Sequence, residues 1–214
     1  MPPKPKFTRE EIVETALRIV SEKGIEGLTA RELGDGLGSS ARPIFTVFKN
    51  MEELQEEVRL AAMRYFENFD GVTEEDIPVF KRIGMQMVLF AVREPKLYRL
   101  LFMQENHAAV SFKELFGKPG SNAQLCMDAI CRDYHLSPEE AENLFENVWI
   151  YTFGVGTLCA CGVCSFPEEK IAGMLTTEFK AIMTLLKSGK ESEKEDGKRN
   201  RENPKTGTEV KESK

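Results

Sequence analysis

The chain has 214 residues, of which 41% are hydrophobic and 30% charged, and its net charge at pH 7 is −6. This composition is typical of a soluble globular protein and leaves enough residues to bury a core. The longest apolar run, residues 148–163, is too short for a convincing membrane span, and residues 1–7 lack the apolar stretch of a secretory signal. Five cysteines without framework spacing indicate the reducing cytoplasm.

The acidic charge is unevenly distributed. Residues 1–54 carry eight basic and nine acidic side chains, residues 55–187 carry 13 and 19, and residues 188–214 carry eight and seven. The N-terminal part is therefore nearly neutral, which permits nucleic-acid binding without favouring it, since strong DNA binders often show a basic patch.

The first elements in chain order are a short arm and a capped helix. Residues 1–7 are expected to be flexible, although Lys4 and Lys6 could contact DNA phosphates. Thr8 and Glu11 form a capping box that predicts a helix from residue 8 to 23, ended by Gly24. Its apolar residues recur at helical spacing.

Residues 29–49 read as two short helices joined by a glycine turn. Thr29 and Glu32 form a second capping box, and Gly38 supplies a left-handed turn residue. Ser39 or Ser40 is then expected to cap a helix whose first turn holds Ala41, Arg42 and Pro43. This spacing is typical of a helix-turn-helix, in which the second helix enters a DNA major groove. The apolar positions expected to complete the small core around it are Leu33, Leu37, Ile44 and Phe48.

A further helix is expected from the cap Asn50-Met-Glu-Glu53 to about residue 70. Over residues 8–54 the signals follow one another in this order: capped helix, Leu-Thr, Arg-Glu-Leu, glycine turn, Ile-Phe-x-x-Phe-Lys-Asn and Glu-Glu-Leu. This order resembles the TetR family of bacterial transcriptional repressors. The resemblance implies an all-α protein. It would have a helix-turn-helix DNA-binding domain (1–54) and a helical ligand-binding and dimerisation domain (55–187).

The resemblance also implies which residues contact DNA. Arg42 could bind a guanine edge through two hydrogen bonds, and Thr46 could contact a base, whereas hydroxyls and Lys49 would bind phosphates. Phe45 stands where the family often has a tyrosine, and it could pack against DNA or against the core, while Phe48 is expected in the core. The full set expected to contact DNA is Thr29, Arg31, Ser39, Ser40, Ala41, Arg42, Pro43, Phe45, Thr46 and Lys49.

The rest of the chain is expected to be helical up to a polar tail. A helix is predicted over residues 77–93, started by Pro78, and a second follows Pro95. Ser121 and Gln124 suggest a capping box, and Ser137-Pro-Glu-Glu140 is the clearest helix start in the chain. The last helix is predicted over residues 167–186, and residues 188–214 are expected to be disordered because they hold a single aliphatic residue.

The two long C-terminal helices resemble the pair through which the family forms homodimers, so that two heads can bind a palindromic operator. The expected interface residues could instead belong to the core of one protomer. They are Gly154, Leu158, Leu175, Phe179, Ile182 and Met183.

A ligand cavity between helices is the usual site for a small apolar effector in such a body, although the same residues would also suit an ordinary core. His107, His135, Tyr98 and Tyr151 are candidate polar anchors. The apolar set expected to line the cavity is Met63, Phe66, Met87, Phe90, Phe102, Phe145, Trp149 and Phe153.

The function predicted from the sequence is that of a TetR-type repressor that leaves its operator when a ligand binds. The sequence contains no catalytic motif, so we do not expect the protein to be an enzyme. We also expect no cofactor and no resident metal. One alternative is a metal- or thiol-responsive regulator that uses Cys159, Cys161 and Cys164, although three cysteines lack the fourth ligand of a closed zinc site. Another is a helical ligand-binding or interaction protein that no longer binds DNA.

Overall fold

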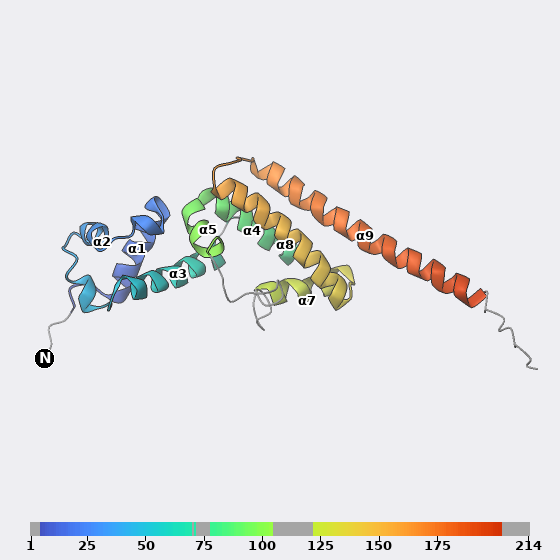
Figure 1. The fold of residues 1–214 in the computed structure, drawn as a ribbon, viewed down its shortest axis with the longest axis horizontal. Helices are drawn as coiled ribbons and strands as arrows, with labels where there is room; N and C mark the ends of the chain where they lie inside the picture. The colour runs from blue at the N-terminus through green and yellow to red at the C-terminus, as the bar shows by residue number, and fades with distance from the viewer. Residues whose placement is uncertain (1–4, 70, 72–77, 105–121, 203–214) are drawn as a thin grey trace, which may run out of the picture.

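The computed structural model describes residues 5–69, 71, 78–104 and 122–202. Within this part of the chain every regular element is helical, which confirms the all-α prediction. The elements are α1 (Arg9–Lys23), η1 (Ile25–Gly27), α2 (Ala30–Gly36), η2 (Ile44–Thr46), α3 (Met51–Glu67), α4 (Val79–Arg93), α5 (Pro95–Phe102), α7 (Asn122–Tyr134), α8 (Pro138–Ala160) and α9 (Glu168–Glu202). Helices α1 to α3 form a head at one end of an elongated molecule, and α9 runs alongside α8 and extends beyond it toward the other end (Figure 1).

The head forms around the caps and apolar positions that the sequence indicates. Thr8 and Glu11 make both hydrogen bonds of the capping box at the start of α1, and Gly24 ends the helix with φ +79°. Asn50 caps α3 by accepting a hydrogen bond from the Glu53 N–H. The expected core is confirmed: Leu33, Ile44 and Phe48 are at most 1% exposed, and Leu37 packs against them.

The start of α2 differs from the sequence prediction in one detail. The Thr29 hydroxyl accepts a hydrogen bond from the Glu32 N–H, as a capping residue does. The Glu32 carboxylate does not return a bond to Thr29 but accepts one from Lys23 at the end of α1. The second capping box is therefore half formed, because a nearby cation competes for the carboxylate.

The second helix of the helix-turn-helix is much shorter than predicted. Residues 41–43 form turns, and only Ile44–Thr46 is helical, as a single 3-10 turn with i→i+3 bonds such as Thr46 N–H to the Pro43 carbonyl at 3.2 Å. Proline has no N–H to donate to a preceding turn, and the Thr46 hydroxyl donates a second bond to the same carbonyl at 2.6 Å. These two features favour a tight turn over a regular α-helix.

The body is organised around α8, which packs against α4, α5, α7 and α9 (Figure 1). Ser137 and Glu140 form the predicted capping box, with Pro138 at the first helical position. Helix α4 begins after Pro78 and ends before Pro95, as the sequence predicts. No helix among the described residues is long and apolar enough to cross a membrane.

Helix α9 is longer than predicted. It continues through Glu202, so residues 188–202 are helical where the sequence suggested disorder, and residues 203–214 lie outside the described residues. Glutamate, lysine and arginine dominate this stretch. All three residue types have high helix propensity, which favours continuation of the helix.

Candidate nucleic-acid interface

The turn between α2 and η2 is held by a close approach at Gly34. The Gly34 carbonyl accepts a hydrogen bond from the Ser39 N–H at 2.9 Å. A Cβ atom on Gly34 would lie 2.9 Å from both the Ala41 nitrogen and the Ser40 carbonyl carbon. The second residue that the turn requires is Gly38, whose φ of +62° is the left-handed conformation expected for it.

The segment after the turn is anchored on one side and exposed on the other. Ile44 is fully buried and Phe48 is 1% exposed, and both belong to the head core. Between them Phe45 is 45% exposed, which excludes the reading that it packs into the core. Arg42, Phe45 and Thr46 are all exposed, so they offer a cation, an aromatic ring and a small polar side chain to a partner.

The other residues expected at this surface vary in exposure. Arg31 is exposed and lies 4.0 Å from Asp35, a contact too long and too solvated to hold it firmly. The Ser39 hydroxyl accepts a hydrogen bond from Lys6 at 2.9 Å, which places the N-terminal arm beside the turn. Lys4 lies outside the described residues. Of the expected set, Thr29, Arg31, Ser40, Arg42, Phe45, Thr46 and Lys49 are exposed, and Ser39, Ala41 and Pro43 are half-buried.

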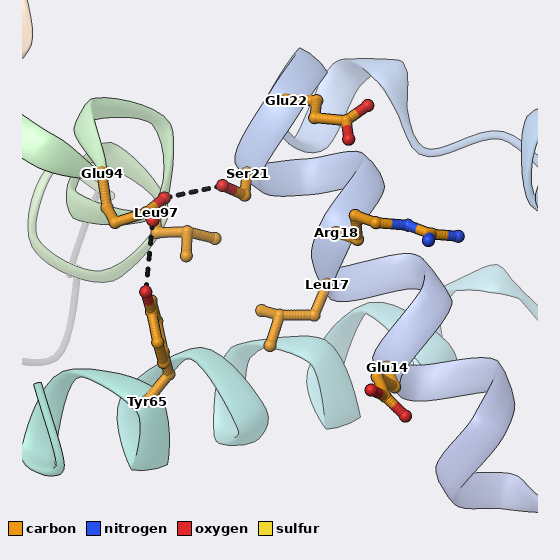
Figure 2. Close-up of a pocket in the computed structure, with 8 residues that line it drawn as sticks. All are labelled: Glu14, Leu17, Arg18, Ser21, Glu22, Tyr65, Glu94 and Leu97. Atoms are coloured by element: carbon orange, nitrogen blue, oxygen red, sulfur yellow. Dashed lines mark hydrogen bonds between the residues drawn. The ribbon is translucent and has the colours of Figure 1, made fainter.

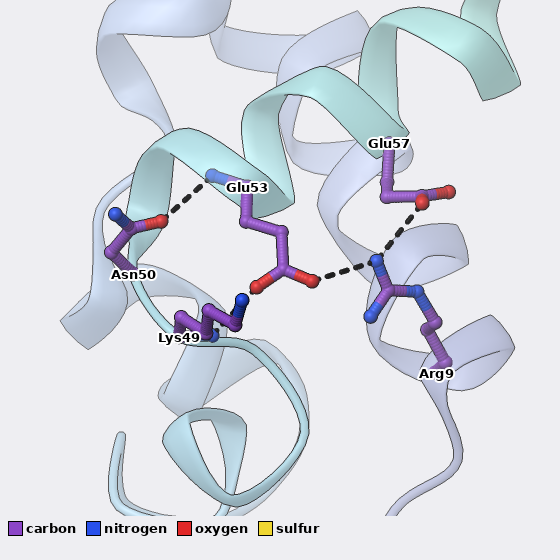
Figure 3. Close-up of polar contacts among 5 residues, drawn as sticks. All are labelled: Arg9, Lys49, Asn50, Glu53 and Glu57. Carbon is purple, nitrogen blue, oxygen red and sulfur yellow. Dashed lines mark hydrogen bonds and ion pairs between the residues drawn. The ribbon is translucent and has the colours of Figure 1, made fainter.

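A polar network fixes the exposed segment to α3 and α1 (Figure 3). Arg9 donates to Glu53 at 3.0 Å and to Glu57 at 2.9 Å, and its guanidinium lies 4.3 Å from the centre of the Phe48 ring. Two hydrogen bonds lower the pKa of Glu53: the larger effect comes from the Lys49 N–H and the next from the Arg9 side chain. The contribution of this network to stability is therefore fully present above the usual pKa of a glutamate. It is lost as the pH falls through the lowered pKa of Glu53.

Arg9 and Gly34 are important residues that the sequence pattern did not indicate. The partners of Arg9 lie 44 and 48 residues further along the chain, so no local spacing could reveal them. Gly34 sits inside a short helical pattern, where a glycine is a weak signal of close packing.

The apolar residues expected to line a ligand cavity fall into three groups. Phe66, Met87 and Phe90 are buried in one cluster, and Phe102, Trp149 and Phe153 pack against it. The ring centres of Phe66 lie 5.1 Å from those of both Phe90 and Phe102, and Trp149 stacks on Phe153 at 5.1 Å. Phe145 belongs to a second cluster with Phe80, and Met63 is 37% exposed on α3. Six of the eight residues therefore lie together.

The candidate polar anchors, in contrast, do not lie together. Tyr98 is fully buried, its hydroxyl lies 3.4 Å from the Phe153 carbonyl, and burial raises its pKa to about 12. Tyr151 is half-buried in a third cluster, and His135 is exposed with φ +54° just after α7. His107 lies outside the described residues.

Two open pockets lie against α1 in the head. One, of about 320 Å³, lies between α1 and α3 and includes Arg9 and Arg64. The other, of about 270 Å³, lies where α1 and α3 meet α5 (Figure 2). There Glu94 accepts hydrogen bonds from Ser21 of α1 at 2.6 Å and from Tyr65 of α3 at 3.2 Å. Neither pocket contains a residue of the apolar set expected to bind a ligand.

The cysteine run lies where α8 turns toward α9. Cys159 and Cys164 are half-buried and Cys161 is exposed. Across the described residues, no three His, Cys, Asp or Glu side chains converge in a way that could hold a metal ion. The metal-responsive alternative therefore gains no ligand set from this geometry.

Comparison with known proteins agrees with this arrangement. Residues 12–58 match the family described as bacterial regulatory proteins, tetR family. The fold is similar to the crystal structure of a protein from Mesorhizobium loti MAFF303099 that is assigned as a TetR-family transcriptional regulator, with a TM-score of 0.55 and 16% sequence identity. The match covers 83% of this chain and 95% of that one. A search of curated protein sequences found no match.

Proposed function

Because this chain belongs to the TetR family of transcriptional regulators, we propose that it is a homodimeric repressor of a palindromic operator, released when a small apolar ligand binds its body. The observation that carries the DNA-binding role is the exposed segment from Arg42 to Thr46, held on a rigid base by Ile44 and Phe48. An exposed reading segment on a packed support is what sequence recognition requires, because a mobile side chain cannot select one base edge.

Arg42 has the central role in this proposal. Its guanidinium can donate two parallel hydrogen bonds to a guanine in the major groove. Phe45 replaces a phosphate-binding hydroxyl with an apolar ring that can contact a thymine methyl group or a sugar. Ser40 and Lys49 flank the segment and are exposed, as phosphate contacts must be.

We place the dimer interface on the outward faces of α8 and α9. Ile150 and Leu158 are 54% and 39% exposed, and Gly154 lies between them on the same side of α8. Leu185 of α9 is 68% exposed. The three α8 residues lie one turn apart, and Leu185 lies on the helix that packs against α8. Exposed apolar side chains on both helices suit a second copy of the chain better than solvent.

The interface expected from the sequence needs one correction. Leu175 and Met183 are only 6% and 8% exposed, because they pack inside the protomer against α4 and α8 clusters. Phe179 and Ile182 are half-buried in the same protomer core. Gly154 and Leu158 remain at the proposed interface, and Ile150 and Leu185 join them.

Replacement of Leu158 by glutamate tests the dimer. The added charge would lie in an apolar interface without a partner, so we expect the variant to sediment as a monomer and to lose most of its operator affinity. Leu125→Glu is the matched control, because Leu125 is 54% exposed on α7, which is not one of the two helices proposed to form the interface. A Leu158→Glu protein that stays dimeric at the same concentration would contradict this placement.

The ligand is proposed to enter between α4, α5 and α8, near the cluster of Phe66, Phe90 and Phe102. Release of DNA then requires that a change in the body reach the head. Glu94, at the corner between α4 and α5, contacts the head directly through Ser21 and Tyr65 (Figure 2). A second contact joins the Lys96 ammonium to the Glu22 carbonyl at the end of α1.

Loss of the Glu94 contacts is expected to loosen the head. In Glu94→Ala the hydroxyls of Ser21 and Tyr65 lose a charged acceptor, which we expect to reduce stability by about 1–2 kcal/mol. Hydrogen exchange should then become faster in the last turn of α1 while the centre of α8 stays protected. Tyr65→Phe removes only one bond and should produce a smaller change. Unchanged exchange in α1 of Glu94→Ala would show that this corner does not hold the head.

A further inference from the structure

The corner between α8 and α9 folds back tightly on the last turn of α8. The Val163 N–H donates to the Leu158 carbonyl at 3.0 Å, and the Gly162 N–H donates to the Cys159 carbonyl at 3.0 Å. Gly162 has φ +69°. This pair of bonds around a left-handed glycine is a Schellman motif. The Cys164 N–H also donates to the Leu158 carbonyl, at 3.2 Å.

The last of these bonds limits the distance between two cysteines. The Leu158 carbonyl belongs to the peptide group that leads into Cys159, and the donor nitrogen belongs to Cys164. With standard bond lengths, an N···O distance of 3.2 Å places the two Cα atoms at most about 7.5 Å apart, and closer for any bent path. Disulfides join Cα atoms about 4.4–6.8 Å apart.

The electrostatics of Cys159 involve Cys164 as well as burial. Burial raises the pKa of the Cys159 thiol, and a negative charge on Cys164 raises it further, while the Phe166 N–H acts in the opposite direction. Cys161 differs from both, because it is exposed and lies two residues after Cys159, on another side of the helix end. Cys126 and Cys131 lie on α7, in a separate cluster.

We propose that Cys159 and Cys164 form a reversible disulfide within one chain when the protein meets a hydroperoxide. In the balanced step both thiols lose their protons and one S–S bond forms. The two sulfur atoms give up two electrons, which cleave the O–O bond of the hydroperoxide and, with the two protons, leave an alcohol and water. With hydrogen peroxide the products are two water molecules.

The hydrogen bond keeps the two residues at opposite ends of one turn, so closing this disulfide would adjust the turn and leave the packing of the helices in place. It follows Leu158 directly and so lies at the edge of the proposed dimer surface. The site does not depend on the proposed function, since it would exist whether or not the head binds DNA.

The closing reaction should become faster as the pH rises from neutral toward the raised pKa of Cys159. The thiolate is the reactive form, and a raised pKa keeps Cys159 mainly protonated at neutral pH. Disulfide yield after a fixed time of peroxide treatment, measured across a pH series, checks this dependence.

The decisive experiment uses the full-length Cys161→Ser variant. The tryptic peptide 133–170 contains Cys159, Cys161 and Cys164, so with Cys161 replaced it holds only the proposed pair. After treatment of the reduced protein with hydrogen peroxide, we expect this peptide to lose the mass of two hydrogen atoms. The change should reverse with dithiothreitol.

Two further variants and one control complete the test. The loss of two hydrogens should disappear in Cys159→Ser and in Cys164→Ser, and it should persist in Cys131→Ser. Circular dichroism before and after oxidation should be the same, since the turn closes on itself. The proposal is overturned by an unchanged peptide mass in Cys161→Ser, by oxygen addition without a cross-link, or by a disulfide that joins two chains on a non-reducing gel.

Discussion

Replacement of Gly34 by alanine is expected to abolish operator binding while the body stays folded. The new Cβ would lie 2.9 Å from backbone atoms of Ser40 and Ala41 and 3.1 Å from the Ser39 carbonyl oxygen. These atoms belong to the main chain of the turn and cannot rotate away, so the turn itself must move. Overpacking of this kind costs about 1–3 kcal/mol and would displace Arg42 from its position.

Gly36→Ala is the matched control for this effect. It lies in the same helix, and its Cβ would meet a side-chain methyl group of Thr15 at 3.1 Å, which can shift. Alanine also has a higher helix propensity than glycine. The two variants should be compared by thermal unfolding and by DNA affinity. If Gly34→Ala bound DNA as well as Gly36→Ala, the close approach at Gly34 would not position the reading segment.

The second large effect is expected for Arg42→Ala. Loss of a bidentate arginine–guanine contact removes about 1–3 kcal/mol of discrimination, which corresponds to roughly 5- to 150-fold in operator affinity. Arg42 is exposed, so the fold should be unaffected. The loss should be large for the operator and small for unrelated DNA, because a base contact specifies sequence and a phosphate contact does not.

Arg99→Ala provides the comparison for Arg42. Arg99 is an exposed arginine on α5, outside the segment expected to contact DNA, and its replacement changes the net charge equally. The affinity for operator and for scrambled DNA should be measured by fluorescence anisotropy. We expect Arg99→Ala to bind both DNAs as the wild type does, and Arg42→Ala to lose affinity mainly for the operator. Equal weakening of both variants would reduce the role of Arg42 to general electrostatic attraction.

Much of the head could be predicted from its sequence because its signals are local. Thr8 with Glu11, Gly24 and Asn50 act on residues within one helical turn, and each does in the structure what its position predicts. The same holds for Ser137 and Glu140 in the body. Caps and turn glycines depend little on distant parts of the chain.

The features that could not be predicted depend on distant or competing partners. Glu32 was expected to complete a capping box, but Lys23 reaches its carboxylate. Arg9 bridges to α3, which no spacing in α1 indicates. An apolar stripe such as Leu175 and Met183 has the same periodicity whether it faces its own protomer or a second one, so only the packed structure shows which it does.

The 3-10 turn over Ile44–Thr46 has a similar explanation. The serines before it are good capping residues, and the pattern alone favours an α-helix. The outcome depends on Pro43, which lacks an N–H, and on the hydroxyl of Thr46, which bonds back to the Pro43 carbonyl. Such competition between side chain and backbone is difficult to read from residue types.

The central proposal is that the segment from Arg42 to Thr46, presented twice by a dimer, reads a palindromic operator. The most direct measurement is a footprint on the DNA upstream of the protein's own gene, at low salt, with the wild-type protein and Arg42→Ala side by side. The account predicts two protected segments related by two-fold symmetry and about one helical turn, roughly 34–36 Å, apart. Both should be lost with Arg42→Ala at the same protein concentration. Protection that is absent at low salt for the wild-type dimer, or that persists unchanged with Arg42→Ala, would contradict it.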